Sequence, residues 1–157
     1  MKRIFYTVAF FFTLLVQHAF AQDSATTQTQ PVLDNYYAIK DGLVNSNPAA
    51  AAASAAEFIK ALNVTDDQTV KKDIRIVLLS DAVSISRSHD IKTQREKFAS
   101  LSDNMVSLAK LTRLSASPVY QQYCPMKKAS WLSSNRAIKN PYYGNAMLTC
   151  GSIKETL

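Results

Sequence analysis

The stretch DIKTQREKFASLSDNMVSLAKLT, residues 90–112, decides the fold. Two sets of side chains recur along it at intervals of seven residues: Ile91, Phe98, Met105 and Thr112, and Gln94, Leu101 and Leu108. This spacing is typical of a helix that packs lengthwise against other helices. Asp90 can cap the first turn of that helix. We expect Met105 to fill the core rather than to bind a metal.

Three earlier segments carry helix-start signals. Asp34 can cap a helix that continues to about Leu43, and Asn47-Pro48 places an N-cap before a proline and a run of alanines. Asp66 or Asp67 can cap the next helix. The sequence therefore predicts an all-α fold, an up-and-down bundle of about four helices within a single domain over residues 34–157.

The residue pattern of the chain changes after Leu114. Ser117-Pro118 ends the helical pattern, and the segment from Val119 to Tyr123 looks short and extended. Turn residues alternate with aromatic ones in the remainder. We expect residues 117–157 to form an irregular C-terminal lobe, locked onto the bundle by Trp131 and the turn over residues 140–144.

The start of the chain has the composition of a secretory leader. Lys2 and Arg3 precede an apolar segment, and Ala19-Phe20-Ala21 offers small residues before a cut. Residues 1–21 are predicted to be a signal peptide cleaved near Ala21, and residues 22–33 a disordered polar tail. The protein is then periplasmic or secreted and is not an integral membrane protein. Without the leader the net charge is +4, from 16 basic and 12 acidic residues.

The sequence lacks the signature motifs of several functional classes. With three glycines, the chain has neither a dinucleotide-binding motif nor a P-loop, and no hydrolase or zinc-protease motif occurs. Past the leader there is a single histidine, His89, which is expected to be an exposed or capping residue more readily than a ligand. The sequence also lacks the dense cluster of basic residues that is typical of nucleic-acid-binding proteins. We expect a protein that is not an enzyme.

Four sulfur atoms come in two short groups in the lobe. Cys124-Pro-Met126 and Met147-Leu-Thr-Cys150 each pair a thiol with a thioether. If they converge, they offer the soft ligands that Cu(I) prefers, with His89 as a further candidate. The alternative is a disulfide between Cys124 and Cys150, which exported proteins commonly form. The spacing favours the disulfide slightly and leaves both interpretations open.

The chain resembles an uncharacterised family of exported bacterial domains, found alone or attached to adaptor subunits of copper- and silver-type efflux systems. The matching residues are Tyr36-Tyr37, Gln94-Arg95, Cys124-Pro-Met126, Trp131-Leu132-Ser133, residues 138–144 and Met147 to Gly151. The resemblance implies a helical domain, a role in metal handling and an efflux adaptor or transporter as partner. One departure is Lys97, which stands where relatives often have a histidine.

Together these observations predict a periplasmic soft-metal binding protein of the Cu(I) type. Its ligands would be Cys124, Met126, Met147 and Cys150. The rival prediction is a non-metal interaction domain with a structural disulfide and an exposed aromatic surface. That surface would consist of Tyr120, Trp131, Tyr142 and Tyr143.

Overall fold

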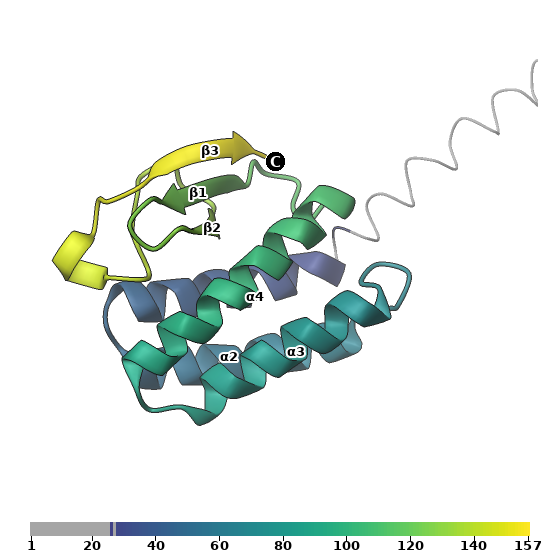
Figure 1. Cartoon of the computed structure of the whole chain (residues 1–157). Helices are drawn as coiled ribbons and strands as arrows, with labels where there is room; N and C mark the ends of the chain where they lie inside the picture. Colours follow the sequence, from purple (N-terminus) through teal and green to yellow (C-terminus); the bar gives the residue numbers. More distant parts are fainter. Residues whose placement is uncertain (1–25, 27) are drawn as a thin grey trace, which may run out of the picture.

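The computed structural model describes residue 26 and residues 28–157, and in this part of the chain four helices form the main body (Figure 1). A first helix over residues 28–44 is followed by α2 (Pro48–Val64), α3 (Lys72–Arg87) and α4 (Ile91–Leu111). The remainder contains the strands β1 (Tyr120–Cys124), β2 (Ala129–Ser133) and β3 (Ser152–Thr156), with a short 3-10 helix, η1 (Gly144–Met147), before β3.

Two of the predicted helix starts are confirmed. The Asn47 side chain accepts a hydrogen bond from the Ala50 N–H at 3.0 Å at the start of α2. The Asp90 carboxylate does the same for the Thr93 N–H at 2.8 Å at the start of α4. These short polar side chains satisfy amides that the first helical turn leaves without partners.

The predicted start of the first helix was wrong. Residues 28–33, assigned above to a disordered tail, are helical, and Val32 and Leu33 are fully buried. Asp34 lies inside the helix and accepts a hydrogen bond from Gln30. The low apolar content of this segment was misleading because its few apolar side chains all face the core.

The helix after α2 also begins later than predicted. Asp66 closes a separate turn, in which its carboxylate accepts the Thr69 N–H at 2.7 Å, and α3 starts at Lys72. Arg75 holds this turn against the end of α2 by donating to the carbonyls of Leu62, Thr65 and Asp66. Tertiary bonds from one arginine therefore outweigh the local capping signal.

Helix α4 is the centre of the molecule, as its spacing predicts. Phe98, Leu101 and Met105 are fully buried, which confirms Met105 as a core residue. α4 packs against α3 on one side and against β2 on the other, and Figure 1 shows the sheet above α4 and α3 below it. The Gln94 amide donates to the carbonyls of Pro48, Ile85 and Ser88, which ties together the ends of three helices.

The C-terminal lobe is not wholly irregular, because it contains a small sheet, and the fold is mainly rather than wholly helical. The three strands form an antiparallel sheet in the order β2-β1-β3. All five residues of β2 are buried, including Ser130 and Ser133, and β1 buries Gln121 and Gln122. The extended segment predicted over Val119 to Tyr123 corresponds to β1, whereas β2 and β3 were missed; in β2, the buried Ser130 and Ser133 remove the alternation that identifies a strand.

An aromatic chain joins the lobe to the bundle. The ring of Tyr36 stacks on Phe98 at 5.3 Å, Phe98 contacts Tyr142 at 6.0 Å, and Tyr142 meets Trp131 at 5.9 Å. The Tyr36 hydroxyl accepts the Leu132 N–H at 3.0 Å. The expectation that Trp131 and the turn over residues 140–144 hold the lobe on the bundle agrees with this packing.

The predicted signal peptide, residues 1–21, lies outside the described residues. Among the helices of the described part, none has the length and apolar character needed to span a membrane.

Candidate functional site

The two cysteines meet at one end of the sheet. Cys124 ends β1, and Cys150 lies between η1 and β3, so the antiparallel pairing of β1 with β3 brings them together. Their Sγ atoms are 3.9 Å apart. A disulfide bond is about 2.05 Å long, so the two residues are free thiols here. The predicted disulfide is therefore not present in this structure, whereas the predicted convergence of the cysteines is.

The two thiols differ in their surroundings. Cys124 is fully buried, and its Sγ accepts the Lys127 N–H at 3.4 Å within the turn between β1 and β2. Cys150 is half-buried. Desolvation, followed by the hydrogen bond and charge interaction with Cys124, raises the pKa of the Cys150 thiol. The pair thus has one sheltered sulfur and one that solvent can reach.

Gly151 allows the backbone next to Cys150 to lie close to β1, which carries Cys124. Its φ of +153° is unfavourable for other residues, and an added Cβ would lie 2.9 Å from both the Trp131 ring and the Tyr123 carbonyl oxygen. The Asn140 amide donates to the Cys150 carbonyl at 2.8 Å and fixes the same segment from the other side. The position of Cys150 is therefore set by its backbone rather than by its side chain.

The two methionines lie on the segments that carry the cysteines. Met126 is in the turn after Cys124 and is 63% exposed. Met147 ends η1, is 40% exposed, and its carbonyl accepts the Cys150 N–H at 3.1 Å. Neither methionine is a core residue, unlike Met105.

His89 does not join this site. It is exposed in the connection between α3 and α4. Over residues 28–157, no group of three or more histidine, cysteine or acidic side chains is placed to hold a metal ion. Within this part of the chain, the cysteine pair therefore has no histidine or carboxylate ligand beside it.

The proposed aromatic surface was wrong for two of its four members. Trp131 is fully buried and Tyr142 is 4% exposed, because both belong to the aromatic chain between lobe and bundle. The Tyr142 hydroxyl donates to the Ser130 carbonyl, and burial raises its pKa well above the usual value. Tyr120 and Tyr143 remain partly exposed.

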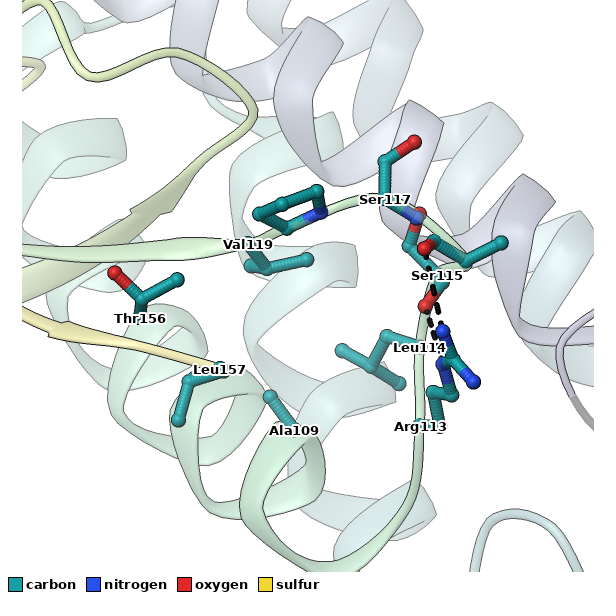
Figure 2. A pocket seen from close by; sticks show the side chains of 10 residues that line it. Ala109, Arg113, Leu114, Ser115, Ser117, Val119, Thr156 and Leu157 are labelled. Atoms are coloured by element: carbon teal, nitrogen blue, oxygen red, sulfur yellow. Dashed lines mark hydrogen bonds between the residues drawn. The ribbon is translucent and has the colours of Figure 1, made fainter.

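One cavity lies beside Val119, at the opposite end of β1 from Cys124. It has a volume of about 310 Å³ and lies between the end of α4 and the last residues of the chain (Figure 2). Ala109, Leu114, Val119 and Leu157 supply apolar walls. Its one charged side chain, Arg113, donates to the carbonyls of Ser115 and Ala116 in the cavity's own rim. None of the predicted site residues lines this cavity.

A smaller cavity, of about 220 Å³, borders the turn that carries Met126. It is lined by Lys92, Arg95, Glu96, Lys127, Tyr142 and Tyr143. The sequence did not single out these cations, because they come from α4 and from a turn more than 30 residues away. The adjacent pair Gln94-Arg95 was noticed only as part of a resemblance.

A family model matches residues 32–117, which is more than half of the chain. The family is described as a protein of unknown function (DUF3347). The chain belongs to this family. The matched residues cover α2 to α4 and most of the first helix and end before β1, so the match does not reach the two cysteines. No curated protein and no solved structure matches the chain.

Proposed function

We propose that the protein is a periplasmic binding protein for Cu(I) or a similar soft ion, which exchanges that ion with a heavy-metal efflux adaptor or transporter. The observation that carries the proposal is the distance of 3.9 Å between the Sγ atoms of Cys124 and Cys150. The leader predicted over residues 1–21 supports the compartment, and the family resemblance supports the efflux partner.

The sulfur spacing favours a bent, three-coordinate arrangement. With metal–sulfur bonds of about 2.3 Å, as in zinc thiolates, a separation of 3.9 Å corresponds to an S–metal–S angle of about 115°. A linear two-coordinate ion would need the thiolates about 4.6 Å apart at the same bond length. The third ligand is then a thioether from Met126 or Met147, which flank the cysteines and are exposed.

The donor set selects for a soft ion. Thiolates and thioethers are the ligands that Cu(I) prefers, whereas a structural zinc site needs four thiolate or imidazole ligands. Among the described residues, this site has two thiols, and no histidine, further cysteine or carboxylate is placed to act as a third ligand. The Lys127 N–H, which donates to the Cys124 sulfur, would also stabilise a bound thiolate.

The test is an anaerobic titration of the reduced protein with Cu(I) in competition with a chromogenic chelator. We expect one ion per chain, and loss of at least about tenfold in affinity on Cys150→Ser, since half of the thiolate set is removed. Because metal binding displaces thiol protons and the pKa of Cys150 is raised, affinity should increase with pH.

Matched variants separate the roles of the sulfur atoms. Met126→Leu and Met147→Leu are expected to weaken binding, whereas Met105→Leu, in the core, and His89→Ala should leave it unchanged. Tight stoichiometric binding by a folded Cys124→Ser/Cys150→Ser double variant would refute the site. An absence of binding by the wild-type protein would favour the non-metal interaction domain instead.

A further inference from the structure

The smaller cavity concentrates positive charge beside the β1–β2 turn. Lys92 and Arg95 come from the first turns of α4, and Lys127 comes from the turn that follows Cys124. One carboxylate, Glu96, faces the same cavity. Three cations and one anion leave a net charge of +2 around a space of about 220 Å³.

Arg95 is held in place by its neighbours. Its Nε donates to the Pro141 carbonyl at 2.9 Å, and its Nη2 donates to the Leu43 carbonyl at 2.9 Å and to the Ser46 hydroxyl at 3.0 Å. The hydrogen bonds found within residues 28–157 leave its Nη1 without an acceptor. Partial burial of the guanidinium lowers the pKa of Arg95. A fixed guanidinium with free N–H groups is a preorganised donor for an oxyanion.

Neither lysine forms an ion pair with another described residue, although Asp90 lies close enough to Lys92 for their charges to interact. The ion pairs of the described residues join Lys40 to Asp41, Lys60 to Glu57, Arg75 to Asp67 and Lys110 to Glu155. None of them involves Lys92, Lys127 or Glu96. Because like charges around the cavity repel one another, an anion that neutralises them would be stabilised.

We propose that this cavity binds a small dianion, a phosphate or a dicarboxylate, between the guanidinium of Arg95 and the ammonium groups of Lys92 and Lys127. The net charge of +2 matches a dianion. The volume corresponds to about seven water molecules at roughly 30 Å³ each, which is enough for either ligand. Tyr142 and Tyr143 supply the aromatic part of the lining.

This site is independent of the proposed metal site because no sulfur atom takes part in it. It is therefore tested on the reduced, metal-free protein, and its failure would leave the Cu(I) proposal untouched. Conversely, a protein that binds no Cu(I) can still bind the anion.

The experiment is isothermal titration calorimetry of the full protein with inorganic phosphate and with succinate, each at low ionic strength. The double variant Lys92→Gln/Lys127→Gln removes the two flanking charges. Its matched control is Lys97→Gln/Lys128→Gln, which removes two exposed lysines from α4 and from the same turn but outside the cavity. We expect the first variant to weaken binding about tenfold and the control less than about twofold.

Each outcome decides the proposal. Binding of phosphate alone or of succinate alone supports the site and identifies which source of oxyanion it takes. An equal loss of anion affinity in both double variants would show that binding depends only on the overall net charge, and it would overturn the proposal. No heat with either anion on the wild-type protein, confirmed by unchanged amide resonances of Tyr143 and Lys127 in NMR spectra, would also overturn it.

Discussion

The helical bundle and the C-terminal lobe are stabilised by different means. In the bundle, apolar side chains at helical spacing bury one face of each helix, as Phe58 and Leu62 do in α2 and Phe98 and Met105 in α4. In the lobe, every strand is five residues long, and four of the eight buried residues of β1 and β2 are polar, compared with two of the seven in α4.

The lobe therefore relies on specific hydrogen bonds. The Asn140 side chain accepts the Tyr142 N–H at 2.8 Å and donates to the Cys150 carbonyl, and the Gln122 amide donates to the carbonyls of residues 135–137. A three-stranded sheet of this size needs a partner surface to be stable. Here α4 and Tyr36 supply that surface. The positions of the two thiols, at one end of the sheet, therefore depend on the packing of the sheet against the bundle.

The strongest test of this dependence is Trp131→Ala. Trp131 is fully buried, and its removal should lower the free energy of unfolding by about 3–5 kcal/mol. If lobe and bundle share one core, urea unfolding followed by circular dichroism will remain a single transition at a lower midpoint. Phe58→Ala in α2 should shift the same transition similarly, and Leu111→Ala, which is 67% exposed, should shift it little. A separate early transition in Trp131→Ala would show that the lobe unfolds alone.

A smaller effect is expected from Arg95→Ala. The change removes the hydrogen bonds from the guanidinium to Pro141, Leu43 and Ser46, and should cost about 2–3 kcal/mol. Hydrogen exchange should then increase in residues 140–144 more than in the interior of α3. The control is Lys97→Ala, two residues along the same helix and exposed. Uniform acceleration over the whole chain would contradict a local role in attaching the lobe.

The smallest effect concerns alkaline pH and Tyr36, whose hydroxyl bonds both Ser102 in α4 and the Leu132 N–H in β2. Burial raises the pKa of Tyr36, so above about pH 10 the unfolded chain loses this proton while the folded chain retains it. Stability should therefore fall as pH rises, by about 1.4 kcal/mol per pH unit for this tyrosine. Urea unfolding between pH 9 and 11 should show a shallower decline in Tyr36→Phe, and an unchanged slope would contradict the assignment.

The fold of the bundle followed from local patterns. The seven-residue spacing over residues 90–112 and the caps Asn47 and Asp90 were sufficient to place α2 and α4. The helix starts were wrongly predicted where tertiary contacts outweighed a local sequence signal. Asp66 caps a turn rather than α3 because Arg75 binds the carbonyls around it, and residues 28–33 are helical because the core takes up Val32 and Leu33.

The candidate site was predicted only in part. The sequence pointed to Cys124 and Cys150 because of their residue type, and the structure places them together. The exclusion of Trp131 and Tyr142 from the surface could not be predicted, because an aromatic residue in a turn-rich segment is compatible with either a core or an exposed patch. The grouping of cations around Arg95 was not predicted, since these residues are separated along the chain and follow no period.

The sequence by itself determined the helices, because amphipathic spacing and capping act between residues within a few positions of each other. The tertiary structure alone decided the strand order β2-β1-β3, the meeting of the two thiols and the cavity between α4 and the β1–β2 turn. Each of these joins residues distant along the chain. Their pairing depends on how the lobe packs against α4, and no short-range pattern in the sequence encodes that packing.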